Sequence, residues 1–171
     1  VVDIRPHSIS ITNLHGEVLP TKEYEISWDA SAAERGGYQH FMLKEIYEQP
    51  KSVADTLIGR TRGLTEEIAS AIDLKEITKV VIIACGTAYH AGMVGKYAIE
   101  RWADVAVDVE LASEYRYREP SIDKKTLVIP ISQSGETMDT LMALRYAKSQ
   151  GAKIFSVCNT NGSTIPRESD A

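Results

Sequence analysis

The sequence predicts a three-layer α/β protein with a parallel sheet, preceded by a short β segment. From residue 79 onward, apolar runs rich in β-branched residues alternate with amphipathic helical patterns. This alternation is typical of βαβ units, whose crossovers cover both faces of a parallel sheet with helices. The first thirty residues instead alternate polar and apolar side chains between turn residues, which indicates antiparallel strands.

The amino-terminal region, residues 1–29, is expected to form two or three strands, at residues 8–12, 17–19 and 24–28. Strands of this size are rarely stable alone. They are therefore expected to pack on a part of the protein that lies outside this chain. The first residue is Val1 instead of methionine, so we expect a piece of a longer protein.

Residues 30–78 are predicted to be a helical linker. Residues 39–49 have a helical pattern, and Pro50 suits the first turn of a following helix, where a missing N–H does no harm. A further short helix is expected at residues 65–71.

Residues 79–171 carry the predicted sheet, with strands at 80–84, 105–111, 126–131 and 153–158. The helix after the first strand has an apolar stripe along one face, formed by Val94, Tyr97, Ala98 and Trp102. A second helix is expected at residues 137–149, with Gly151 at its carboxyl end.

Composition excludes several functions. A net charge of −5 gives no general attraction to nucleic acid, and no apolar stretch is long enough to span a membrane. The two cysteines have no metal-binding or disulfide spacing, which favours a reducing cytoplasmic compartment. We expect neither a metal nor a cofactor.

The turn at residues 132–137 is the strongest candidate site. It follows a strand and precedes a helix, whose first N–H groups attract anions, and Gly135 allows a ligand to approach the backbone. Ligands of parallel sheets bind at the carboxyl ends of the strands. The turn therefore predicts a binding site for a phosphate ester, with neutral donors from Ser132, Gln133, Ser134 and Thr137. The alternative is that these residues only cap the helix.

A similar turn, Cys85-Gly86-Thr87, follows the first strand of the sheet, and Thr87 is expected to face the same crevice. A helix cap is again the alternative. A buried structural role for Cys85 is favoured over a nucleophile with His90 as its base. Polar surface roles are likewise favoured for residues 159–164 and for Glu114, Arg116 and Arg118.

Several segments resemble the glutamine–fructose-6-phosphate aminotransferase family. The two turns, with Asn159 and residues 167–170, resemble its first sugar isomerase (SIS) domain. Residues 44–50 resemble the more specific segment that joins the glutaminase domain to the isomerase domains, and residues 110–118 are a further match. Residues 1–29 resemble the last strands of the glutaminase domain.

The resemblance implies a role in making glucosamine 6-phosphate from fructose 6-phosphate and glutamine. It implies that the sugar phosphate is bound by Cys85, Gly86, Thr87, Ser132, Gln133, Ser134 and Thr137. Some members have serine at the position of Ala88, which puts one hydroxyl contact in question. The family's cysteine nucleophile and isomerisation residues have no counterpart here, so no catalytic residue is expected in this chain. The resemblance also implies a homodimer for the full-length protein.

Two other functions remain open. A phosphosugar-binding regulator would normally carry a DNA-binding helix-turn-helix, which residues 1–78 do not show. A sugar-phosphate isomerase or deglycase of the same fold would not need the amino-terminal strands.

Overall fold

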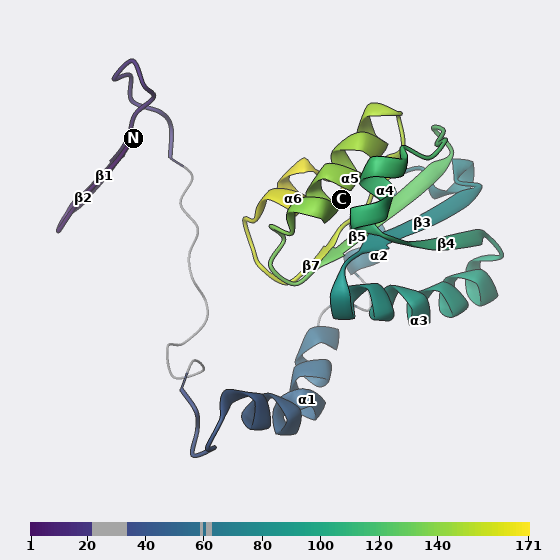
Figure 1. Cartoon of the computed structure of the whole chain (residues 1–171), viewed down its shortest axis with the longest axis horizontal. Helices are drawn as coiled ribbons and strands as arrows, with labels where there is room; N and C mark the ends of the chain where they lie inside the picture. Colours follow the sequence, from purple (N-terminus) through teal and green to yellow (C-terminus); the bar gives the residue numbers. More distant parts are fainter. Residues whose placement is uncertain (22–33, 59, 61–62) are drawn as a thin grey trace. The chain divides into compact units, whose positions relative to one another are not determined.

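The computed structural model describes residues 1–21, 34–58, 60 and 63–171 (Figure 1). These residues form two compact units, Val1–Gln49 and Pro50–Ala171. The predicted strand at residues 24–28 lies outside the described residues, and the predicted domain boundaries at residues 29 and 78 stay predictions.

The first unit begins with a hairpin of two exposed antiparallel strands, β1 (Val2–Arg5) and β2 (Ser8–Ile11). The expected strand at residues 17–19 is reduced to a single bridge between Thr12 and Val18. A two-stranded hairpin is marginally stable in water.

Helix α1 (Phe41–Leu57) corrects one prediction, because it continues through Pro50 instead of restarting there. A proline inside a helix removes its own N–H bond and frees the carbonyl four residues earlier. That residue is Ile46, which is exposed, so water can bind the freed carbonyl. The next elements are α2 (Gly63–Ala71), which begins two residues before the prediction, and the short helix η2 (Leu74–Glu76).

The second unit contains the predicted parallel sheet. Its strands are β3 (Lys79–Ala84), β4 (Ala106–Leu111), β5 (Thr126–Ser132), β6 (Lys153–Ile154) and β7 (Val157–Cys158). The order is β4-β3-β5-β6, and β7 also pairs with β5. The single strand expected at residues 153–158 is therefore wrong. Between β6 and β7 the backbone turns to the chain end, where the N–H of Ser156 donates to the carbonyl of Ala171 at 2.9 Å.

Helices cover both faces of this sheet, as the three-layer prediction requires (Figure 1). Helix α3 (Gly86–Ala103) lies on one face, while α4 (Ala112–Arg118), α5 (Met138–Ser149) and α6 (Thr164–Glu168) lie on the other. Alternate residues of β3 divide between the two cores: Val81 and Ile83 pack toward α4 and α5, and Val80 and Ile82 pack toward the opposite side. The short helices α4 and α6 were not predicted.

The apolar stripe of α3 does not face the sheet. Val94 is 73%, Tyr97 75% and Trp102 85% exposed. Gly92 is the buried residue of this helix, and a Cβ atom there would lie 2.8 Å from Cγ2 of Ile82. The helix therefore sits close to the sheet through a residue without a side chain and packs Ile99 on the core, while Val94, Tyr97 and Trp102 are exposed.

Candidate functional site

The carboxyl ends of three neighbouring strands meet at one edge of the sheet. Ala84 of β3 is in register with Ile131 of β5, and Ser132 is in register with Cys158 of β7. The turns after these strands, which begin at Cys85, Gln133 and Asn159, therefore share this edge. This arrangement brings together the two turns that were predicted from the sequence to form a phosphate-binding site.

The turn after β5 is shaped by its own hydroxyl groups. The backbone N–H of Gly135 donates to Ser132 Oγ at 3.0 Å, and the N–H of Glu136 donates to Ser134 Oγ at 3.2 Å. The hydroxyls of Ser132 and Thr137 lie 2.9 Å apart. Gly135 has a φ of +66°, a left-handed conformation that favours glycine. Ser132 and Ser134 thus have a structural role in the turn.

Thr137 occupies the N-cap position of α5, yet its side chain makes no capping bond there. Its hydroxyl bonds to Ser132 instead. The alternative in which Thr137 simply caps the helix is therefore not what the structure shows. The helix has twelve residues, and the first N–H groups of such a helix carry a partial positive charge and can bind an anion.

The turn after β3 also begins a helix that has no side-chain cap. Cys85 is at the N-cap of α3, without a side-chain capping bond, and Gly86 follows with a φ of +59°. Thr87 is exposed in the first turn of this helix. Two helix N-termini without side-chain caps therefore begin at the same edge of the sheet.

A hollow of about 340 Å³ opens at this edge. Three of the predicted binding residues line it: Thr87, Ser132 and Gln133. The other four, Cys85, Gly86, Ser134 and Thr137, belong to the same turns but are not among its lining residues. Asn159, for which a simple polar turn was favoured, does line the hollow.

Two lining residues come from outside the sheet and the turns that follow its strands, and they were not predicted. Thr56, in the last turn of α1, and Arg60, just after that helix, contribute to the hollow beside Ser132 and Gln133. No local pattern in the sequence marks either residue, because they reach the edge only through the folding of the second unit. Arg60 is the only residue with a charged side chain among the ten that line the hollow.

The residues that line the hollow are suited to binding a ligand and not to catalysis. Its ten lining residues include no carboxylate, imidazole or lysine, so none of them is an ordinary general base. Burial raises the pKa of the Cys158 thiol, and a hydrogen bond with the Ser132 backbone lowers it by less. Cys158 is therefore a neutral thiol near pH 7. The residues that the structure describes contain no cluster of three potential metal ligands.

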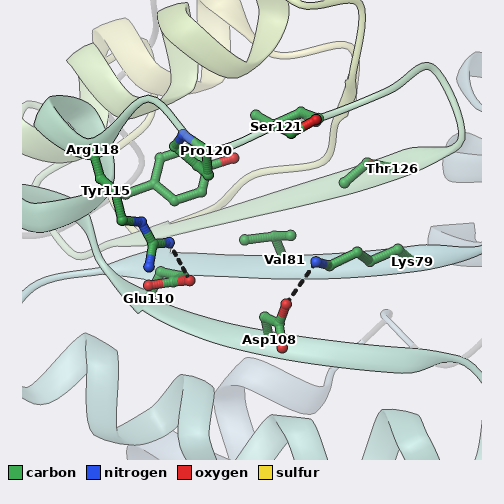
Figure 2. Close-up of a pocket in the computed structure, with 10 residues that line it drawn as sticks. Lys79, Val81, Asp108, Glu110, Tyr115, Arg118, Pro120, Ser121 and Thr126 are labelled. Carbon is green, nitrogen blue, oxygen red and sulfur yellow. Dashed lines mark hydrogen bonds and ion pairs between the residues drawn. The ribbon is translucent and has the colours of Figure 1, made fainter.

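A second hollow, of about 260 Å³, lies over β3 and β4 beside α4 (Figure 2). Its charges are already paired: Lys79 with Asp108 at 2.7 Å, and Arg118 with Glu110 at 2.5 Å. The buried Tyr115 hydroxyl has no hydrogen-bond partner among the described residues, and burial raises its pKa. This hollow offers no unpaired charge to an anionic ligand.

The remaining polar candidates make surface interactions. Arg116 pairs with Asp139 at 2.7 Å, and Glu114 is exposed in the first turn of α4.

None of the described helices is long and apolar enough to cross a bilayer.

Comparison with known proteins identifies the class. Residues 73–171 match the model of the SIS domain, and the chain belongs to this family. Solved structures agree: a putative phosphosugar isomerase from Salmonella typhimurium LT2 superposes with a TM-score of 0.55 at 26% identity, covering 61% of this chain and 32% of its own.

The nearer similarity is to one kind of enzyme. A glutamine–fructose-6-phosphate aminotransferase from Streptomyces coelicolor is 57% identical over the whole chain, which spans 29% of that enzyme. The enzyme from Mycolicibacterium smegmatis is 60% identical over 88% of the chain and 24% of its own length. The C-terminal domain of a glucosamine-fructose-6-phosphate aminotransferase from Francisella tularensis superposes with a TM-score of 0.73 at 42% identity, covering 80% of this chain and 39% of that domain. The chain thus spans less than a third of the curated relatives that it matches.

Proposed function

We propose that this chain supplies part of the sugar-phosphate site of a glutamine–fructose-6-phosphate aminotransferase. The observation that carries the proposal is the hollow at the edge of the sheet, where α3 and α5 begin without side-chain caps. Fructose 6-phosphate and glucosamine 6-phosphate are the proposed ligands. The identity to aminotransferases over the whole chain supports this choice.

The proposed phosphate contacts combine backbone and side-chain donors. The first N–H groups of α5 would face the phosphate, with the Gln133 amide and the Thr87 hydroxyl beside them. Cys85 and Gly86 would contribute backbone, and Ser132, Ser134 and Thr137 would shape the turn or bind directly. Neutral donors suit a ligand that arrives as substrate and leaves as product with the same phosphate.

Turnover is expected to need the rest of the enzyme. Transfer of a proton between C1 and C2 of the sugar requires a general base, and the hollow has none among its lining residues. Release of ammonia from glutamine requires a glutaminase nucleophile. We therefore infer that the chain binds ligand without catalysis, and that the full-length enzyme works as a cytoplasmic homodimer.

A phosphosugar isomerase or a sugar-binding regulator is the second candidate. A putative sugar binding protein from Salmonella typhimurium LT2 has a similar fold, with a TM-score of 0.62 at 26% identity. The aminotransferase is preferred because its identity is more than twice as high.

Ligand specificity can be tested by thermal unfolding of the 171-residue chain. A ligand that binds only the folded state stabilises it by about 2.7 kcal/mol at one hundred times its Kd. Millimolar fructose 6-phosphate or glucosamine 6-phosphate should therefore raise the Tm by several degrees. Fructose and inorganic phosphate, at matched ionic strength, should not. Equal shifts with all four compounds would contradict the proposal.

Arg60 is expected to strengthen the binding of the dianion, because it is the charged residue that lines the hollow. Arg60→Gln should raise the Kd for fructose 6-phosphate about three- to tenfold, as expected for an exposed charge. Arg60→Lys should retain most of the affinity. Isothermal titration at low and high salt measures both effects, because screening should weaken the wild type more than Arg60→Gln.

Arg101→Gln provides the matched control, since Arg101 is an exposed residue in the last turn of α3 and does not line the hollow. An equal loss of affinity in Arg101→Gln and Arg60→Gln would mean that only net charge matters.

A further inference from the structure

Glu136 presents a problem for phosphate binding, because it lies within the 132–137 turn. A carboxylate facing the ligand would repel a dianion. The structure directs this side chain elsewhere: Glu136 Oε1 accepts a hydrogen bond from the backbone N–H of Thr164 at 2.7 Å. Glu136 is not among the residues that line the hollow.

The partner of Glu136 belongs to residues 160–165, which we call the brace segment. Two further bonds join this segment to the turn. The Thr160 hydroxyl donates to the carbonyl of Gln133 at 3.1 Å, and the N–H of Ile165 donates to the carbonyl of Gly135 at 2.9 Å. Three residues of the turn, Gln133, Gly135 and Glu136, are thus bonded to the brace segment.

The brace segment is itself fixed to the core. Ile165 is completely buried, and the Arg145 guanidinium of α5 makes two bonds to the Glu168 carboxylate of α6, at 2.6 and 2.8 Å. These contacts tie α6 to α5. The turn leads into α5 and is bonded to the start of α6. The contacts between these two helices therefore fix the position of the turn.

Glu136 also supplies the side-chain hydrogen-bond acceptor that the start of α6 lacks. Ser163 is at the N-cap of α6 but makes no side-chain capping bond, because its hydroxyl donates to the carbonyl of Thr160 at 2.7 Å. The Glu136 carboxylate takes the N–H of the first helical residue instead. One side chain thus completes the end of α6 and joins it to the turn.

We propose that Glu136 is a positioning residue, which holds the 132–137 turn in its binding shape by accepting the Thr164 N–H. The proposal rests on the proposed sugar-phosphate site. It assigns the role to the acceptor oxygen and not to the charge. Binding should therefore survive replacement by glutamine, whose side-chain oxygen can accept the same bond.

The test compares Glu136→Ala with Glu136→Gln in the 171-residue chain, with Glu114→Ala as the control for loss of an exposed carboxylate, since Glu114 lies in helix α4. Isothermal titration with fructose 6-phosphate should give a Kd about tenfold weaker for Glu136→Ala, the loss expected for a helix-capping acceptor. Glu136→Gln and Glu114→Ala should stay within threefold of the wild type. Each variant is titrated at a temperature that lies the same number of degrees below its own Tm. This separates the loss of affinity from general unfolding.

Hydrogen exchange at the Thr164 amide gives a readout that needs no ligand. Exchange should accelerate at least fivefold in Glu136→Ala and stay near the wild-type rate in Glu136→Gln. A Kd for Glu136→Ala within twofold of the wild type would overturn the proposal, as would a Glu136→Gln variant as weak as Glu136→Ala. If the wild type itself did not bind fructose 6-phosphate, the proposed function would fail. The exchange data would then still decide whether Glu136 holds the brace segment.

Discussion

Replacing Gly135 with alanine is expected to destabilise the chain by about 2–5 kcal/mol and to remove sugar-phosphate binding. A Cβ atom at this position would lie 1.9 Å from Ser163 Oγ and 2.6 Å from Ser163 Cβ. Ser163 cannot move away easily, since it is buried and bonded to Thr160. The φ of +66° adds backbone strain for any residue with a side chain.

Gly95→Ala is the matched control for that variant. Gly95 lies inside α3, and its nearest neighbour to an added Cβ is Ile82 Cδ1, at an ordinary contact distance of 3.9 Å. Alanine should therefore stabilise the helix by about 0.5–1 kcal/mol. Urea unfolding of both variants measures the difference in stability. A Gly135→Ala variant as stable as Gly95→Ala would show that the brace segment can retreat from the turn.

Ser132→Ala should have the second largest effect. Ser132 is buried, and its hydroxyl accepts the N–H of Gly135 and bonds to Thr137. Alanine leaves both groups without this partner, which should cost about 1–3 kcal/mol of unfolding free energy. The loosened turn should also weaken fructose 6-phosphate binding at least tenfold.

The control is Ser149→Ala, whose exposed hydroxyl donates to the carbonyl of Tyr146 at 2.7 Å. Its unfolding free energy should change by less than about 0.5 kcal/mol. Urea unfolding and isothermal titration test both variants. If Ser132→Ala lost no more stability and affinity than Ser149→Ala, the internal bonds of the turn would be unimportant.

Local patterns were sufficient to predict the sheet and the position of the site. The β-branched runs in β3 and β5 are long enough to identify buried parallel strands. Gly151 was expected to end α5, and it has a φ of +90° just beyond that helix. Because parallel strands present their carboxyl ends at one edge, the sequence alone was enough to place the turns after β3 and β5 together.

Other features depended on contacts between distant segments. The apolar stripe of α3 is a genuine helical pattern, but Gly92 and Ile99 are on the side that contacts the sheet. At the break between β6 and β7, the N–H of Ser156 donates to the carbonyl of the distant Ala171. None of these outcomes can be read from a short window of sequence.

The sequence by itself determined the three-layer fold, the turns at the sheet edge and the likeness to the aminotransferases, because each depends on neighbouring residues or on a fixed topological rule. Only the tertiary structure decided how the turn at residues 132–137 is held. Thr164 lies 28 residues after Glu136, and Arg60 precedes Ser132 by a still longer stretch of chain. Folding brings such residues together through packing of the whole unit, so no local sequence pattern predicts their contact.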